Sequence, residues 1–339
     1  MKKIISLLLV LTMVFTVAAC SNNGGNDAPV DNTPTVTEKT YKLGMGVVVG
    51  NSSKDEQAQT DSTVVALVTD EEGKIVAAAI DVAQNKMPMD AVDSAKEFKS
   101  KQELLFDYNM KNASPIGKEW FEQAAGYCEW LVGKTVADVK GQTTEEKNGH
   151  QVSTDAELYA SCTMQVTDFF AATVKAFEDE QGKTFTTAGE FTLGLGVTST
   201  AADSTEDVIK MYSDFGAVVV ADGKALAAVC DAIQPQVDYT SGSPEFKFNG
   251  TKRELKEGYN MVKFAEDCNN EWYQQSAAFT DYVVGLTAAD VAGIATRVRG
   301  ESEPHAGYVV VADETLFASC SIQINGFQGS LAKAFANAK

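Results

Sequence analysis

The chain has 339 residues and a formal net charge of −19. Its hydrophobic content of 44% and charged content of 22% are ordinary for a globular protein, which excludes a wholly disordered chain, a collagen and a disulfide-stabilised miniprotein. The acidic balance argues against a nucleic-acid partner, because a phosphate backbone would be repelled. A polytopic membrane protein is also excluded, since the long apolar run is confined to the first 20 residues.

The first 19 residues predict a signal peptide. Lys2 and Lys3 precede an apolar run over residues 4–17 that is short for a membrane span. The run ends in Val-Ala-Ala-Cys at residues 17–20, which resembles a bacterial lipobox. This resemblance implies that Cys20 is lipidated and becomes the mature N-terminus. Two acyl chains suffice for stable anchoring, so we expect an exported lipoprotein on the outer face of the bacterial cell membrane.

Residues 20–40 predict a flexible linker that follows the lipidated cysteine. The stretch is rich in Asn, Gly, Pro, Asp and Thr and has almost no large apolar side chains. Such a composition cannot bury a core and stays solvated. It would hold the folded part of the chain away from the lipid surface.

The rest of the chain is two copies of one module, module 1 at residues 41–180 and module 2 at residues 191–339. The matches recur in the same order, with YKLGMGV at 41–47 returning as FTLGLGV at 191–197 and ASCT at 160–163 returning as ASCS at 318–321. Each copy is of domain size, about 150 residues, which indicates a tandem duplication rather than a solenoid of short repeats.

Each module begins with predicted strands. In module 1 these cover residues 43–49, 64–68 and 74–80, and the last two form a hairpin around the Gly-containing turn at 70–73. In module 2 the corresponding hairpin lies at 217–230.

Helices follow the strands. In module 1, Ser114 is expected as N-cap and Pro115 as first residue of a helix that ends at Gly133. A short helix then starts at Thr135, whose capping-box partner is Asp138. The same two helices are expected in module 2, where Gly285 ends the first and Thr287 caps the second.

Alternating apolar and polar residues at 158–166 and 316–324 predict a half-buried strand in each copy. Closing helices are expected at 169–177 and 327–335, capped by Asp168 and Asn325. The fold class is therefore α+β: two tandem copies of a small, largely antiparallel sheet with helices packed on one face.

The cysteines and histidines do not form a recognisable motif. The cysteines lie at positions 20, 128, 162, 230, 268 and 320, without a C-x-x-C pair, so we expect no zinc site and interpret most of them as buried thiols. His150 and His305 each precede the last predicted strand of their copy. They are either ligand or proton-transfer residues, or polar loop residues.

Two further features of each copy allow two interpretations. The G-x-G at Gly44 and Gly46, repeated at residues 194–196, indicates a close backbone approach or a bulge, or alternatively a phosphate contact. Trp120 and Trp272 are either ring-stacking surfaces for a ligand or core residues of an amphipathic helix.

A Gly-Lys hairpin at residues 72–75, followed by Ile80-Asp81, a late Ser/Thr-containing element and a closing helix, is similar to the FMN-binding domain. That domain occurs in RnfG/NqrC-like electron-transfer subunits and in surface flavin lipoproteins. Its D-x-x-[ST]-G-A-[ST] motif has its nearest match at residues 157–163 and 315–321, with Ser-Cys in place of Gly-Ala. The resemblance implies Thr163 and Ser321 as acceptors of a phosphoester-linked FMN. Over nearly its whole length, the chain resembles two-module surface lipoproteins of Clostridium-like Firmicutes.

These observations favour a cell-surface lipoprotein with a duplicated small-ligand-binding module, which binds FMN and relays electrons if the family resemblance holds. Thr163, Ser321, Trp120 and Trp272 are the candidate cofactor-binding residues, and no metal site is expected. The alternative is a surface binding or structural protein without a cofactor, for which a duplicated domain suits bivalent binding. No complete catalytic constellation is visible, which favours a binding role over an enzymatic one and places a hydrolase last.

Overall fold

The structure, a computed structural model, describes residues 37–264 and 269–339. The expected signal peptide, Cys20, most of the linker and Cys268 lie outside the described residues. Within them, no helix is both long and apolar enough to cross a membrane.

The first copy is built mainly of three long strands and two long helices. Its elements are β1 (Lys39–Asn51), β2 (Gln57–Thr69), β3 (Ile75–Pro88), β4 (Glu97–Phe98), α1 (Lys101–Leu104), η1 (Leu105–Tyr108), α2 (Trp120–Leu131), α3 (Val136–Lys140), β5 (Thr144–Lys147), β6 (His150–Ser153), α4 (Ala156–Ser161) and α5 (Thr167–Phe177).

The second copy repeats this plan after strand β7 (Lys183–Thr187), which joins the two. Its elements are β8 (Thr192–Thr200), β9 (Val208–Lys210), β10 (Tyr212–Ala221), β11 (Lys224–Ile233), β12 (Gln236–Asp238), β13 (Glu245–Lys247), α6 (Lys252–Leu255), η2 (Lys256–Tyr259), α7 (Met261–Phe264), α8 (Trp272–Val283), α9 (Ala288–Ala292), β14 (Thr296–Val298), β15 (Val309–Val311), α10 (Glu314–Phe317) and α11 (Asn325–Asn337).

The long strands form two antiparallel sheets. Sheet A has the order β3-β2-β1-β7, and sheet B has the order β11-β10-β8-β4. The short strand β4 comes from module 1 but pairs with β8 of module 2. The edge of sheet B is therefore completed by the other copy.

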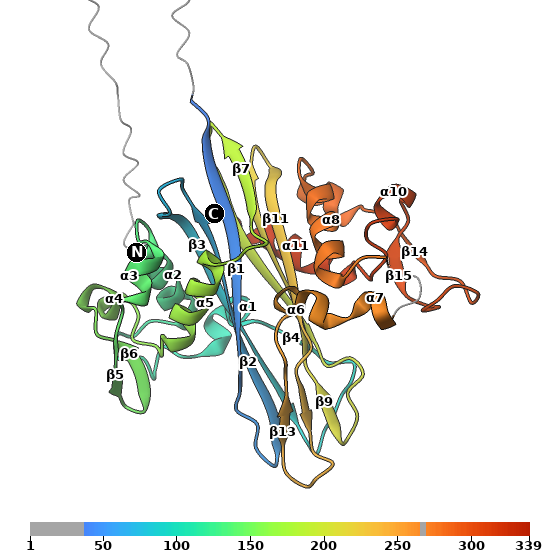
Figure 1. Ribbon diagram of the computed structural model, residues 1–339. Helices are drawn as coiled ribbons and strands as arrows, with labels where there is room; N and C mark the ends of the chain where they lie inside the picture. The colour runs from blue at the N-terminus through green and yellow to red at the C-terminus, as the bar shows by residue number, and fades with distance from the viewer. Residues whose placement is uncertain (1–36, 265–268) are drawn as a thin grey trace, which may run out of the picture. The chain divides into compact units, whose positions relative to one another are not determined.

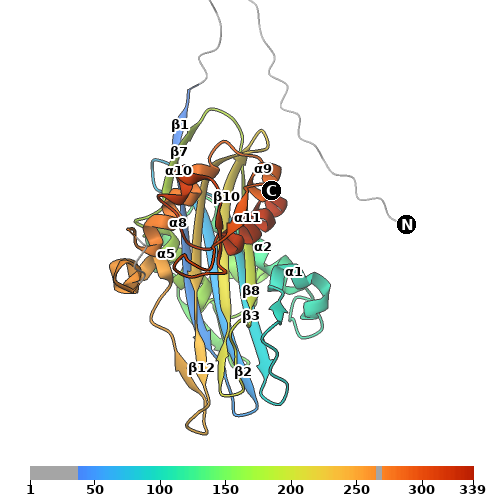
Figure 2. The same cartoon turned by 90° about the vertical axis from the view of Figure 1, so that its right-hand side faces the viewer.

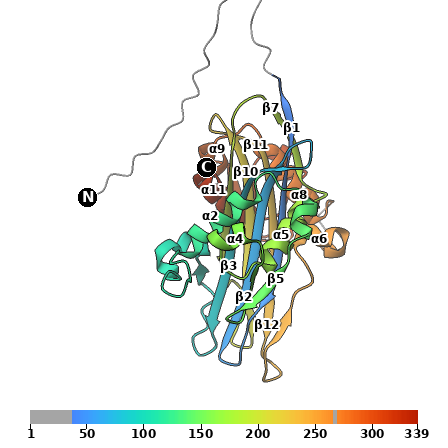
Figure 3. The same cartoon turned by 90° about the vertical axis from the view of Figure 1, so that its left-hand side faces the viewer.

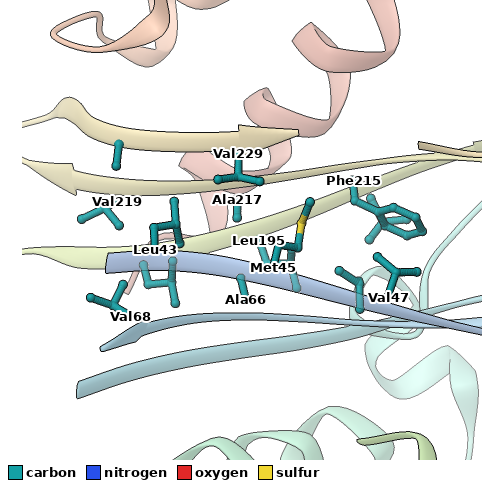
Figure 4. Close-up of a cluster of buried hydrophobic side chains, with 14 of the residues drawn as sticks. Leu43, Met45, Val47, Ala66, Val68, Leu195, Phe215, Ala217, Val219 and Val229 are labelled. Atoms are coloured by element: carbon teal, nitrogen blue, oxygen red, sulfur yellow. The ribbon is translucent and has the colours of Figure 1, made fainter. Parts of the chain in front are cut away.

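Sheets A and B face each other across one apolar core. Leu43, Met45 and Val47 alternate along β1 and point into it, and Leu195 and Phe215 meet them from sheet B (Figure 4). All five side chains are at most 5% exposed. Each copy thus buries one apolar sheet face against the other copy.

The opposite face of each sheet is covered by helices of its own copy. Helices α2 and α5 pack on sheet A, and α8 and α11 pack on sheet B (Figures 1, 2 and 3). The order of layers is helices, sheet, sheet, helices. This arrangement confirms the predicted α+β class, with a largely antiparallel sheet and helices on one face in each copy.

The two G-x-G segments allow the closing helices to touch the sheets. A Cβ placed on Gly46 would lie 2.2 Å from the carbonyl oxygen of Ala172 in α5. A Cβ on Gly196 would lie 2.1 Å from the carbonyl oxygen of Ser330 in α11. The structure therefore supports the interpretation of a close backbone approach.

The two copies exchange equivalent ion pairs. Lys175 Nζ on α5 lies 2.6 Å from Glu254 Oε1 on α6, and Lys333 Nζ on α11 lies 2.7 Å from Glu103 Oε1 on α1. Each pair joins the closing helix of one copy to the short helix of the other. Such reciprocity is the mark of a two-fold interface, here formed within a single chain.

A buried ion pair breaks this internal symmetry. Arg253 makes two hydrogen bonds of 3.1 Å to the carboxylate of Asp179, and both side chains are at most 8% exposed. Asp179 also accepts the backbone N–H of Met45. Gln102 stands at the position of Arg253 in module 1, and Asn337 at the position of Asp179 in module 2, so the pair occurs on one side only.

The strand predicted at residues 158–166, and its counterpart at 316–324, are wrong. Residues 156–161 form α4 and residues 314–317 form α10, each followed by an irregular stretch. Asp155 caps α4 by accepting the N–H groups of Glu157 and Leu158. Leu158 and Cys162, four residues apart, are both fully buried, so the apolar positions follow a helical spacing that the alternation concealed.

Helix starts are also corrected. Helix α2 begins at Trp120 with Glu119 as N-cap, while Ser114 instead accepts hydrogen bonds from residues of the preceding turn. Val166 and Ile324 occupy the N-cap positions of the closing helices, in place of Asp168 and Asn325. The predicted helix stops at Gly133 and Gly285 are confirmed by φ angles of 83° and 84°.

Two equivalent buried aspartates hold the short helices against the sheets. Asp81 Oδ1 accepts the N–H of Gln102 at 3.1 Å, and Asp231 Oδ1 accepts the N–H of Arg253 at 3.1 Å. Burial is the main cause that raises the pKa of each carboxyl to about 6. The folded protein therefore favours the protonated form of both groups relative to the unfolded chain.

We expect Gly46→Ala to lower the free energy of unfolding by about 3 kcal/mol or more, because its methyl group would overlap backbone that cannot move away. Gly50→Ala in the same strand is the control, since its Cβ has no atom nearer than 3.7 Å. Urea denaturation of the two variants measures the difference. Equal stability of the two variants would contradict the close approach.

We expect Asp81→Asn to reduce the pH dependence of unfolding. A raised folded-state pKa contributes stability that is present below the unfolded pKa of about 3.9 and is lost as the pH rises through about 6. The variant should therefore gain stability relative to the natural protein between pH 4.5 and 7.5, by roughly 2 kcal/mol. Asp107→Asn, at an exposed position, should show no such gain in urea titrations at the two pH values.

Candidate functional site

A cavity of about 620 Å³ opens on the helix-covered face of sheet A. We call it the module 1 cavity. Its floor is formed by β2 and β3, and its walls by the α1–η1 corner, the start of α2, the hairpin β5–β6 and residues 159–169. This volume lies within the range of small-molecule sites in proteins.

Three residues that the sequence singled out meet in this cavity. Trp120, His150 and Thr163 all line it, although they come from α2, β6 and the stretch after α4. Trp120 is 2% exposed and packs edge-on against Phe169, with ring centroids 6.3 Å apart. Trp120 is therefore a core residue that also lines the cavity wall.

Thr163 is held by a hydrogen-bonded amide. Its backbone N–H and its Oγ1 both donate to Gln123 Oε1, at 2.8 and 3.1 Å. Gln123 Nε2 in turn donates to Ser114 Oγ at 2.9 Å. The side chain of Gln123 is fully buried, so this network fixes Thr163 at the edge of the cavity.

Polar residues of the floor were missed by the sequence analysis. Asp61 Oδ2 accepts Gln59 Nε2 at 2.9 Å, and Asp61 Oδ1 accepts Gln84 Nε2 at 2.8 Å. Gln59, Asp61 and Thr63 alternate along β2 and face the cavity. This period-two run of polar residues, next to the apolar run at 64–68, is the signal that could have identified the floor.

Asp168 faces the same space from the first turn of α5. Burial, followed by the charge of Asp61, raises the pKa of its carboxyl above the usual range. Among the described residues, this carboxylate has no hydrogen-bond or ion-pair partner. No grouping of three or more metal-ligating side chains is found in the described parts of the chain.

The cations of the cavity stack on aromatic rings. Lys101 Nζ lies 4.9 Å from the ring centre of Tyr108 and 5.8 Å from that of Trp120. Lys147 Nζ lies 3.9 Å from the ring centre of Tyr159 and pairs with Glu145 at 2.7 Å. Both lysines therefore have partners within the protein.

Module 2 repeats these contacts in part. Gln275 Oε1 accepts the backbone N–H of Ser321 at 2.8 Å, as Gln123 does for Thr163. Lys252 Nζ lies 5.3 Å from the ring centre of Trp272, which packs on Phe327. The internal support of the site is thus duplicated.

Among the described residues of module 2, the hollow beside Ser321 is smaller than the module 1 cavity. A hollow of about 100 Å³ in module 2 is lined by Gln275 and Ser321, and neither Trp272 nor His305 belongs to its lining. His305 lies in a loop, where its ring stacks on Tyr308 at 5.3 Å. The predicted residues Trp120, His150 and Thr163 line one cavity in module 1, whereas of their counterparts in module 2 only Ser321 lines this hollow.

The described cysteines are unsuited to chemistry. Cys128, Cys162, Cys230 and Cys320 are free thiols. Burial raises the pKa of Cys162 to about 11 and those of Cys128 and Cys320 to about 12. The protonated thiol is a poor nucleophile, so these residues act as packing groups.

Comparison with known proteins gives one partial relative. A chlorophenol reductase of Desulfitobacterium hafniense is 30% identical over 127 aligned residues, which cover 31% of this chain and 39% of the relative. The chain thus spans about two fifths of the length of this curated relative. No family model matches the sequence, and no solved structure matches the chain.

Proposed function

We propose that this protein is an exported, lipid-anchored surface protein whose module 1 cavity binds a small organic molecule with a planar ring. The observation that supports this most directly is the cavity of about 620 Å³, into which Trp120, Thr163 and His150 converge from separate elements. Small-molecule sites in proteins are typically well-formed pockets with apolar or aromatic walls and a few polar groups in fixed positions.

A ring-bearing ligand agrees with the lining of the cavity. Tyr108, Trp120, Tyr159 and Phe169 supply aromatic surface, while Gln84 and Thr163 supply polar atoms held in place. The partial relative is named for its action on a chlorinated phenol, which is also a small planar ring. Both points favour recognition of a ring. The reductase activity of that relative is not proposed for this chain.

FMN is the cofactor to test first, and the lining fits its ring better than its phosphate. The aromatic walls suit an isoalloxazine. A phosphoester on Thr163 fits less well, because its hydroxyl is hydrogen-bonded to Gln123 and the residue is 9% exposed. Lys101 and Lys147 would have to leave their aromatic partners to meet a phosphate.

The alternative is a binding protein without a cofactor. It is favoured by one observation, the closed hydrogen-bond network around Thr163, which leaves no activated acceptor for covalent attachment. In both cases, module 2 acts as the structural counterpart of module 1, since it supplies half of the shared core. Ser321 and Trp272 would then have supporting roles.

We expect Thr63→Trp to block the module 1 cavity, because Thr63 lines it and is 4% exposed. In titrations of the full chain with FMN followed by flavin fluorescence, affinity should fall at least tenfold, while Val132→Trp at an exposed site should leave it unchanged. Binding that survives Thr63→Trp would move the site elsewhere. No binding, together with no flavin spectrum in protein purified from its native host, would remove FMN and leave the alternative.

We expect Cys20→Ala to abolish membrane attachment, because the resemblance to a lipobox makes this thiol the acceptor of the diacylglycerol. The measurement is partition of the exported protein between detergent and aqueous phases. Cys128→Ala is the matched control and should remain in the detergent phase. A Cys20→Ala protein that still partitions with detergent would contradict lipid anchoring at this residue.

A further inference from the structure

Two carboxylates face one part of the module 1 cavity, and no cation among the described residues pairs with either of them. Asp61 and Asp168 face it from β2 and α5, and the charge of Asp61 is felt at Asp168. Asp61 is oriented by amide donors on both of its oxygens. Asp168 has no hydrogen-bond or ion-pair partner within the described ranges, whereas Lys101 and Lys147 lie over aromatic rings.

An unpartnered hydroxyl lies on the same face of β2. Thr63 lies two residues beyond Asp61 on the same face of β2, lines the cavity and is 4% exposed. Within the described chain its hydroxyl has no hydrogen-bond partner. Polar groups inside proteins are normally hydrogen-bonded, and this unpartnered hydroxyl at the cavity wall is available to bond to a ligand atom.

Module 2 also has a carboxylate at the equivalent position, but a different strand residue supplies it. By strand register, Asp214 of β10 corresponds to Thr63, because it pairs with Thr198 and Ala232 where Thr63 pairs with Val48 and Val82. Gly326, the second residue of α11, corresponds to Asp168 in α5.

The loss of the aspartate side chain at Gly326 is matched by the gain of one at Asp214, which lies next to Gly326. A Cβ placed on Gly326 would lie 2.4 Å from Asp214 Oδ2. The carboxylate of Asp214 therefore occupies the position where the side chain of Asp168 begins in the other copy. A negative charge at this end of the module is retained although the residue that carries it has moved to the opposite wall.

We propose, building on the proposed function, that the carboxylate end of the module 1 cavity binds the protonated nitrogen of a small ring-bearing amine. Asp168 forms the ion pair, Asp61 is the second carboxylate, and the hydroxyl of Thr63 accepts a further N–H. The ring of the ligand lies against the aromatic walls. An unpaired carboxylate in a partly dry cavity gains most from such a cation.

The test uses three indoles that share one ring and differ in charge. The full chain is titrated calorimetrically at pH 7.5 with tryptamine, with neutral tryptophol and with anionic indole-3-propionate. Tryptamine should bind at least tenfold more tightly than tryptophol, and indole-3-propionate should bind most weakly. Asp168→Asn should reduce the tryptamine preference to threefold or less, with Asp61→Asn as second variant if the first fails to fold. Asp107→Asn, exposed and outside the lining, should preserve the full preference.

Each other result has a defined meaning. Equal binding of all three indoles would overturn the amine proposal and leave ring recognition standing. FMN binding without binding of any indole would also overturn it. If Asp168→Asn lowers the melting temperature but keeps the tenfold preference, Asp168 only stabilises the start of α5, and the proposal is wrong. Failure of FMN and of every indole would remove the proposed function as well.

Discussion

The rest of this structure depends on the burial of both faces of each sheet. A single copy makes an amphipathic layer of sheet and helices, and its remaining sheet face carries residues such as Met45 and Val64 that are at most 4% exposed in the complete chain. Burial of a large aliphatic side chain contributes roughly 1.5–3 kcal/mol. The two copies therefore complete each other, and the duplication of the sequence is a structural requirement as much as a functional one.

The internal two-fold relation explains which features are duplicated and which have diverged. Contacts that join the copies, such as the pairs of Lys175 and Lys333, are reciprocal because each copy meets the same surface of the other. The buried pair of Arg253 and Asp179 occurs once, beside module 1's β1, and a bidentate arginine fork held at low exposure fixes geometry more than it adds stability. The module 1 cavity lies away from this interface, on the helix-covered face of sheet A.

The sequence predicted the elements whose signals are local. The hairpin turn at Gly73, the helix stops at Gly133 and Gly285 and the capping box at Thr135 all require particular residues at particular backbone angles, and all are present. Alternation over residues 158–166 misled because small residues such as Ala160 and Ser161 fit either period. Tertiary packing determines the helix there, because Leu158 and Cys162 are both buried in the core beneath α2. The continuous apolar run at residues 64–68 is typical of a strand buried on both faces. It does not indicate what covers the second face, so the face-to-face packing of the two sheets was not predicted.

The sequence predicted only those residues of the candidate site that recur in both copies. Trp120, Thr163 and His150 were identified by their recurrence in both copies, and recurrence selects residues that support the module. Asp61, Thr63 and Asp168 do not recur, since Tyr212, Asp214 and Gly326 stand in their places. Comparison of the copies therefore identifies the residues that support the cavity walls and misses the two carboxylates that face the cavity. The positions at which the copies differ inside the module 1 cavity carry the information on ligand choice. Those positions exchange a threonine and an aspartate for an aspartate and a glycine around one retained carboxyl group.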